Sequence, residues 1–146
     1  PRGRILMAVT VIASAEEPIR NDQRRRAVGM KWLALKYAAG GELTVGSPFE
    51  WVPGVNRCIH VAGTWGTGGH LKLQGSNLAS PNAAEAAATL TDWFLLTNPQ
   101  GTVIDFSANG GAEVTETPRH IRPVITAGDG TTSLNVYVVT VRSGGA

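Results

Sequence analysis

The sequence contains a single cysteine, Cys58, among 146 residues. One cysteine cannot form a disulfide within the chain, so burial and hydrogen bonds must hold the fold together, as is usual in a reducing compartment. Charged residues are also few, at 16% of the sequence, and the net charge at pH 7 is only +2. Because nucleic-acid-binding domains are strongly basic, this charge predicts no nucleic acid partner.

Long apolar runs are missing as well. The longest run, residues 5–13, is interrupted by Thr10, and it is much shorter than the roughly 18 apolar residues of a membrane-spanning helix. Arg2 and Arg4 precede this run, but residues 14–17 after it form a poor cleavage site for a secretory signal. We therefore predict no membrane partner.

Glycine and proline are abundant, with 18 and 8 residues, and so many turn formers disfavour a helical bundle. From residue 47 onward, stretches with strand composition alternate with turn sequences such as Asn98-Pro99-Gln100-Gly101 and Asp129-Gly130. The predicted strands cover residues 49–52, 57–65, 70–74, 89–97, 102–107, 113–117, 119–126 and 132–142. Eight strands at this spacing predict an all-β fold, an antiparallel β-sandwich or barrel.

Two local features within this region lead to further predictions. Ser80 and Pro81 precede an alanine-rich stretch, which predicts one short helix over residues 80–87 with Ser80 as its N-cap. Pro123 interrupts the strand 119–126. Because proline has no amide hydrogen for a neighbouring strand, it predicts an edge strand or a bulge at this position.

The first 46 residues differ from the rest in charge. They hold eight Arg and Lys against four Asp and Glu, a net charge of +4, whereas the remainder holds five against seven, a net charge of −2. We predict that residues 1–46 form an N-terminal arm that packs against another surface, and that residues 47–146 form the β-sandwich domain. The segment 30–37 within the arm fits a helix or a strand, because periodicity does not decide between them. The partner-binding residues predicted on the arm are Arg20, Arg24, Arg25, Arg26, Trp32 and Tyr37.

The patterns of common catalytic and metal sites were not found in the sequence. The three histidines do not have the spacing of zinc ligands, and Cys58 with His60 on one strand face supplies only two ligands. The glycine-rich segment 63–69 lacks the following Lys and Ser or Thr of a phosphate-binding loop. Acids beside turns, Asp105, Glu113 and Glu116, are expected to be solvated. We therefore predict that the protein is not an enzyme and uses no cofactor or metal.

Three tryptophans, Trp51, Trp65 and Trp93, offer an alternative function. Aromatic side chains on an exposed loop could form a platform for a sugar, so a glycan-binding module is a second hypothesis. Large aromatic side chains more often fill a core. The exposure of these indole rings discriminates between the two possibilities.

Several motifs of turns and core strands resemble small virion proteins that are encoded beside the capsid genes of tailed bacteriophages. They span about two thirds of the chain and are Phe49–Gly54, Val61–Gly66, Leu71–Asn77, Asn98–Gly101, Arg119–Pro123 and Gly128–Thr132. The resemblance implies a jelly-roll-like head decoration (cement) protein without catalytic residues. Such a protein assembles in the host cytoplasm, binds the major capsid protein on the outside of the virion, and forms a homodimer or homotrimer. A neck or tail component is the alternative.

Overall fold

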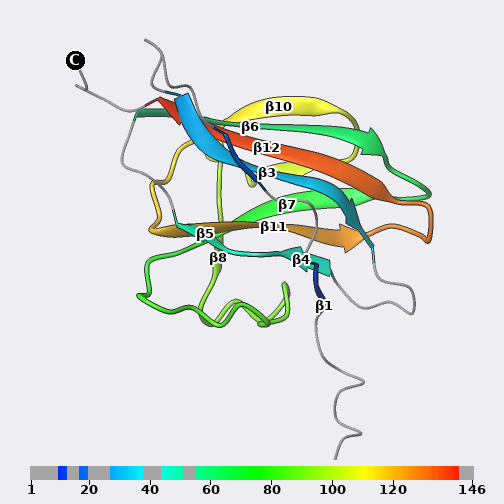
Figure 1. The fold of residues 1–146 in the computed structure, drawn as a ribbon, viewed down its shortest axis with the longest axis horizontal. Coiled ribbons are helices and arrows are strands. Elements are labelled where there is room, and N and C mark those ends of the chain that lie inside the picture. Colours follow the sequence, from blue (N-terminus) through cyan, green and yellow to red (C-terminus); the bar gives the residue numbers. More distant parts are fainter. Residues whose placement is uncertain (1–9, 13–16, 20–26, 38–43, 51–54, 142–146) are drawn as a thin grey trace, which may run out of the picture.

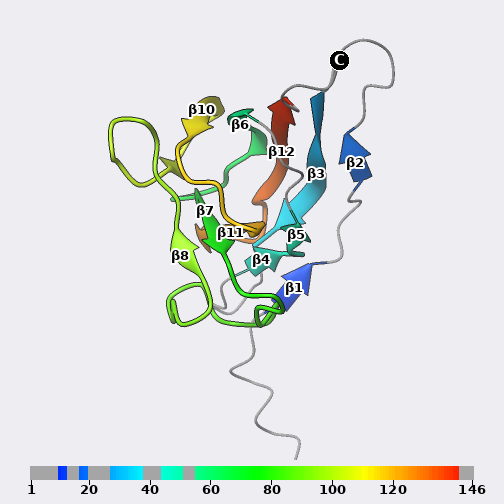
Figure 2. The same ribbon diagram turned by 90° about the vertical axis from the view of Figure 1, so that its left-hand side faces the viewer.

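The structure, a computed structural model, describes residues 10–12, 17–19, 27–37, 44–50 and 55–141. These residues form two β-sheets that pack face to face (Figures 1 and 2). The strands are β1 (Thr10–Ile12), β2 (Glu17–Ile19), β3 (Ala27–Lys36), β4 (Thr44–Gly46), β5 (Phe49–Glu50), β6 (Val55–Thr64), β7 (His70–Ser76), β8 (Phe94–Leu95), β9 (Asp105–Phe106), β10 (Gly110–Val114), β11 (His120–Ala127) and β12 (Ser133–Val141).

One sheet is seven-stranded, with the order β1-β4-β11-β7-β8, β5 beside β11 and β9 beside β7. The other is five-stranded, with the order β10-β6-β12-β3-β2. Among the described strands, all pairs are antiparallel except β1 with β4. The predicted all-β sandwich is therefore confirmed. The described residues contain no helix that is long and apolar enough to cross a membrane.

The main core lies between the two sheets and is built by alternation along the strands. Side chains at every second position point inward, and their burial stabilises the fold by about 1.5–3 kcal/mol for each fully buried Leu, Ile or Val. The fully buried members on the four central strands are Ile59, Val61, Leu71, Leu73, Ile121, Ile125, Leu134, Val136 and Val138.

The eight strands predicted after residue 47 correspond to β5–β12, although β8 is much shorter than the predicted strand 89–97. The predicted turns are also present. Gly101 N donates to Asn98 O over 2.9 Å, and Thr132 N donates to Asp129 O over 3.1 Å. Asparagine and aspartate thus begin turns where the sequence places them.

The predicted boundary at residue 46 is corrected by β3 and β4. β3 lies inside the five-stranded sheet, between β12 and β2, and β4 pairs with β11 in the other sheet. Residues 27–37 and 44–46, placed in the arm by the sequence analysis, are therefore part of the sandwich. The physical reason is that the apolar face of β3 covers the core, since Trp32 and Leu35 are fully buried.

A bulge in β3 explains why periodicity left the segment 30–37 undecided. Trp32 pairs with Val136 and Leu35 pairs with Leu134, so two residues of β3 lie opposite one residue of β12. Ala34, in the bulge, has a φ of 55°, and its amide donates to Asn135 Oδ1 over 2.9 Å. The extra residue shifts the alternation by one position, which breaks the two-residue period that a strand otherwise shows.

Pro123 lies in an interior strand, so the predicted edge position is wrong and the predicted irregularity is present. β4 and β5 pair with β11 in registers that differ by one residue, and Pro123 lies opposite the junction between them. At this junction Trp32 Nε1 donates to Ser47 O over 3.0 Å. A Cβ atom on Gly46 would lie 2.8 Å from Pro123 Cγ, so the close packing here requires glycine.

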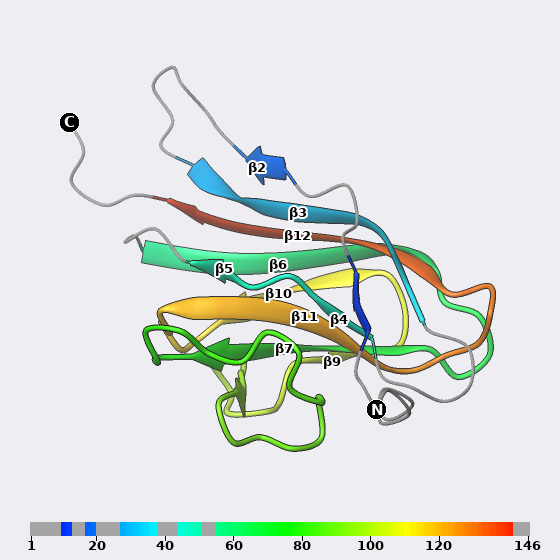
Figure 3. The same ribbon diagram turned by 60° about the horizontal axis from the view of Figure 1, so that its bottom comes forward.

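The segment between β7 and β8, residues 77–93, lies across the outer face of the seven-stranded sheet (Figure 3). We call this segment the covering loop. The short helix predicted over residues 80–87 is not formed, and the chain makes turns there, as in the bond from Glu85 N to Asn82 O. The carbonyl oxygens of Ala83, Glu85 and Ala87 accept hydrogen bonds from side chains of the sheet instead, which removes acceptors that a helix would need.

Candidate functional site

Arg122, on the outer face of β11, holds the covering loop to the sheet. The alternation of β11 turns this side chain away from the main core, yet it is fully buried because the loop lies over it. Its guanidinium donates to Ala83 O over 3.1 Å, to Glu85 O over 2.8 Å and to Gln74 Oε1 over 2.9 Å. Its Cζ lies 4.4 Å from the ring centroid of Trp93. Two of these hydrogen bonds and the cation–π contact fix the loop at three points, Ala83, Glu85 and Trp93, and the bond to Gln74 ties the guanidinium to β7.

Burial lowers the pKa of Arg122 to about 10, and the nearby carboxylate of Glu85 opposes this effect. Arg122 therefore remains protonated at neutral pH. Glu85 is itself buried, and its carboxylate accepts hydrogen bonds from Thr91 N and Asp92 N over 2.9 and 3.0 Å. Since both charges have hydrogen-bond partners, the cost of removing them from water is offset.

A small second cluster of apolar side chains completes the contact between the loop and the sheet. It consists of Val45 from β4, Val124 from β11 and Ala87 from the loop. Gln74 Nε2 donates to Ala87 O over 2.8 Å at the same place. The covering loop is therefore a packed layer of the molecule, built on polar contacts around a few apolar ones.

The exposed large hydrophobic side chains of the described residues all lie in or next to this loop. They are Leu78, Leu90 and Phe94, with 47%, 42% and 37% of their surfaces exposed. Leu90 also has a φ of 54°, in the left-handed region that a bulky side chain rarely adopts. Strained residues of this kind persist only where the surrounding structure holds them in place, and they cluster at functional sites. The hydrogen bonds from Thr91 N and Asp92 N to Glu85 hold the chain directly after Leu90.

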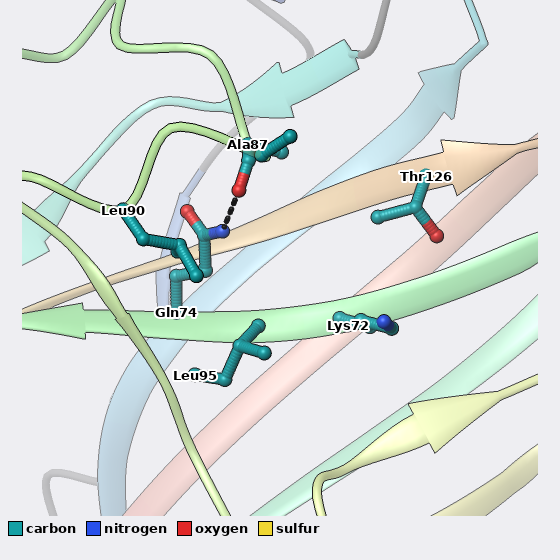
Figure 4. A pocket seen from close by; sticks show the side chains of 7 residues that line it. Lys72, Gln74, Ala87, Leu90, Leu95 and Thr126 are labelled. Carbon is teal, nitrogen blue, oxygen red and sulfur yellow. Dashed lines mark hydrogen bonds between the residues drawn. The ribbon is translucent and has the colours of Figure 1, made fainter.

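A pocket of about 320 Å³ opens between the loop and the outer face of the sheet. Figure 4 shows Leu90 and Leu95 on either side of Gln74, with Lys72 and Thr126 farther along β7 and β11. Ala87 and Ala88 complete the lining. Apolar side chains thus make most of the wall, and Lys72 supplies its one ionisable group among the described residues.

A second cluster of polar contacts joins two turns at one end of the sandwich. The Asp129 carboxylate accepts hydrogen bonds from Thr67 N and from the hydroxyl and amide groups of Thr131. These hydrogen bonds hold the pKa of Asp129 well below its ordinary value, and the bond from the Thr131 hydroxyl has the largest effect. A Cβ atom on Gly66 would lie 2.2 Å from Asp129 Oδ1, so the glycine-rich turn leaves room for this carboxylate. The glycines of the segment 63–69 therefore allow the chain to form a turn.

The predicted partner-binding residues are not brought together by the described structure. Trp32 is fully buried in the main core, so its side chain belongs to the interior rather than to a surface, and Tyr37 is partly buried and packs against the same core. The predicted residues Arg20, Arg24, Arg25 and Arg26 lie outside the described residues.

The tryptophans of the glycan hypothesis take different positions. Trp93, the last residue of the covering loop, is only 2% exposed, and its Nε1 donates to Asn82 O over 2.9 Å, so it cannot present an indole face to solvent. Trp65 is partly buried, and its Nε1 donates to Asn109 Oδ1 over 2.8 Å. Trp51 lies outside the described residues. A glycan platform of several tryptophans is therefore not assembled by Trp65 and Trp93.

The candidate ligand and acid residues form separate pairs rather than one cluster, and Glu113 lies opposite Cys58 in the ladder of β10 and β6. Cys58 and His60 are both exposed on the outer face of β6, where His60 stacks on Tyr137 with 5.7 Å between ring centroids. Asp105 Oδ1 lies 3.0 Å from His70 Nδ1, and Glu116 accepts a hydrogen bond from Thr97 N. In the part of the chain that the structure describes, no group of three His, Cys, Asp or Glu side chains could hold a metal ion.

Arg122, Gln74 and Leu90 are candidate functional-site residues that the sequence did not predict. Alternation along β11 correctly places Arg122 on the face opposite Ile121 and Ile125, but an arginine on an outer strand face normally reaches solvent. Only the covering loop makes this position buried, and its path depends on the tertiary fold. Comparison of the chain with protein-family models, curated proteins and solved structures finds no match.

Proposed function

We propose that the chain is a non-enzymatic attachment module, namely a head decoration protein that binds and stabilises the major capsid protein lattice of a tailed bacteriophage. The resemblance of its turn and strand motifs supports the virion assignment. The β-sandwich fold agrees with it, because a compact sandwich offers a stable scaffold for loops that bind other surfaces.

The exposed apolar side chains around the covering loop carry the attachment part of this proposal. Leu78 and Leu90 are large, exposed and close in sequence to the buried network around Arg122. A loop that is already fixed loses little conformational freedom on binding, so more of its contact energy appears as affinity. Exposed apolar groups on such a loop are therefore suited to contact a capsid surface.

Many copies on a lattice would strengthen weak individual contacts. A homodimer or homotrimer presents two or three covering loops, and the second contact then forms at a high effective concentration. We place the protein on the exterior of the virion, assembled in the host cytoplasm.

Electron microscopy of intact particles tests the location. We expect density for the sandwich at lattice positions, in hundreds of copies as for lattice proteins of a capsid. Density confined to a few copies at the portal or tail vertex would assign the protein to the neck or tail instead.

Co-sedimentation with particles that lack the protein tests the surface. Leu78→Ser should weaken attachment by about tenfold, as expected for an apolar anchor in an interface. Val139→Thr is the matched control, because Val139 is partly exposed on the other sheet. Equal occupancy of the Leu78 variant and the wild type would contradict attachment through the covering loop.

A further inference from the structure

We infer that the pocket beneath the covering loop receives one aliphatic side chain of a partner protein, with an acidic side chain of the same segment next to Lys72. This inference rests on the proposed function, since it specifies what the attachment surface recognises. The occupant follows from the shape, lining and charge of the pocket.

The lining favours an aliphatic group. Ala87, Ala88, Leu90 and Leu95 present apolar atoms, and the pocket volume of about 320 Å³ lies at the lower end of the range for ligand sites. A pocket of this size suits one or two side chains rather than a long peptide. Leu90 is 42% exposed in the unbound protein, so covering it with an apolar group removes unfavourable surface from water.

The charge favours a carboxylate close to the aliphatic group. Lys72 is partly buried on β7, and no described acidic side chain pairs with it. Asp105 lies opposite Lys72 in the ladder, but its carboxylate contacts His70 Nδ1 at 3.0 Å. Arg122 and Glu85 are buried, do not line the pocket, and use their polar atoms within the loop network. Lys72 is therefore the group that can meet an acidic side chain of the partner.

The loop network makes the pocket available before binding. Gln74 lines the pocket, and its amide is fixed because Oε1 accepts from Arg122 Nε and Nε2 donates to Ala87 O. The amide therefore does not form hydrogen bonds that would interfere with a bound partner side chain. The Glu85 carboxylate accepts hydrogen bonds from Thr91 N and Asp92 N, which hold the chain directly after Leu90 and so support its left-handed conformation in the pocket lining. A preformed wall of this kind costs little to order on binding.

The test is an NMR titration of the whole chain with acetyl-Gly-Leu-Glu-Gly-amide. We expect saturable shifts of the methyl groups of Leu90 and Leu95. Replacing the Glu of the peptide by Gln should weaken binding by about threefold, as for a partly exposed ion pair. Replacing its Leu by Ala should abolish the shifts. The absence of saturable shifts with the parent peptide would overturn the inference.

Variants of the protein identify the charge. Lys72→Gln should bind the Glu peptide about threefold more weakly and should bind the Glu and Gln peptides equally, because the ion pair is gone. Lys36→Gln is the matched control, since Lys36 is exposed on the other sheet. An unchanged preference for Glu in the Lys72 variant would refute the role of Lys72.

Other occupants give different results. If hexanoate binds more than tenfold more tightly than the peptide, the pocket is a small-molecule site and the inference is overturned. If the pocket signals shift with protein concentration in the absence of peptide, a second copy of the chain occupies the pocket and the inference is likewise overturned. Particle attachment is measured separately. If Lys72→Gln and Leu90→Ala attach like wild type, the pocket inference fails while the proposed function stands. If the wild type does not attach to particles at all, the proposed function fails.

Discussion

Replacement of Arg122 by methionine is the most direct perturbation of the covering loop. Methionine has a similar length and no charge, so it removes the guanidinium without opening a large hole. The variant leaves Gln74 Oε1, Ala83 O and Glu85 O without their donors in a buried place. Each buried acceptor without a partner costs about 1–3 kcal/mol, and removal of one charge from a buried charged network costs about 3–5 kcal/mol.

The free energy of unfolding should therefore fall by about 3–5 kcal/mol in Arg122→Met. For a chain of this length, such a loss lowers Tm by roughly 10 °C. Arg122→Lys should fall between the wild type and the methionine variant, because an ammonium keeps the charge but cannot reach three acceptors with a planar fork. Urea unfolding and thermal melting measure both changes.

Hydrogen exchange shows where the loss acts. The amides of Thr91 and Asp92 should lose protection in Arg122→Met, because the network that holds the loop is broken, while β6 and β12 retain theirs. Arg119→Met is the matched control. Arg119 is half exposed and pairs with an exposed Glu50 at 3.2 Å, so its loss should change stability by no more than about 0.5 kcal/mol. If Arg122→Met resembles Arg119→Met in stability and exchange, Arg122 does not hold the loop.

Three further variants test other parts of the chain. Ala34→Gly should raise stability by about 1 kcal/mol in urea unfolding, because glycine accepts the left-handed φ of 55° without strain; a loss of stability would contradict this. Because the pKa of Asp129 is lowered by its hydrogen bonds, its contribution is complete above the unfolded value of about 3.9 and is lost as the pH falls through the folded value. The fall in Tm between neutral pH and pH of about 2.5 should thus be smaller in Asp129→Asn, and an equal fall would argue against it. Simultaneous replacement of Arg24, Arg25 and Arg26 by Ala should weaken co-sedimentation with particles but change stability by no more than about 0.5 kcal/mol, and unchanged occupancy would show that these arginines do not bind the partner.

The turns and the strands after residue 47 could be predicted because local chemistry decides them. Asn98 Oδ1 accepts hydrogen bonds from Gln100 N and Thr102 N, so the side chain itself organises the turn that the sequence indicates. Leu71 and Leu73 alternate with Lys72 across β7, and the structure places the two leucines inside. Each of these two signals depends only on residues that are close together along the chain.

The errors arose where distant residues override a local preference. Alanine favours helix by only a few tenths of a kcal/mol over most residues, and the hydrogen bonds that Arg122 donates to Ala83 O and Glu85 O outweigh that preference. In β3, the bulge at Ala34 shifts the inward face by one residue, so the alternation that identifies a strand is lost. Neither the path of the covering loop nor the position of this bulge is readable from neighbouring residues.

The two faces of β11 explain how one strand can fix both layers of the molecule. Ile121 and Ile125 face the main core, whereas Arg122 and Val124 face the covering loop. A slip of β11 by one residue relative to β7 would exchange these faces, because side chains alternate with a period of two. The charge of Arg122 would then enter the apolar core without its three acceptors, at a cost of several kcal/mol, and two isoleucines would leave it. The same buried arginine that holds the candidate attachment surface therefore also disfavours the wrong register of the sheet beneath it.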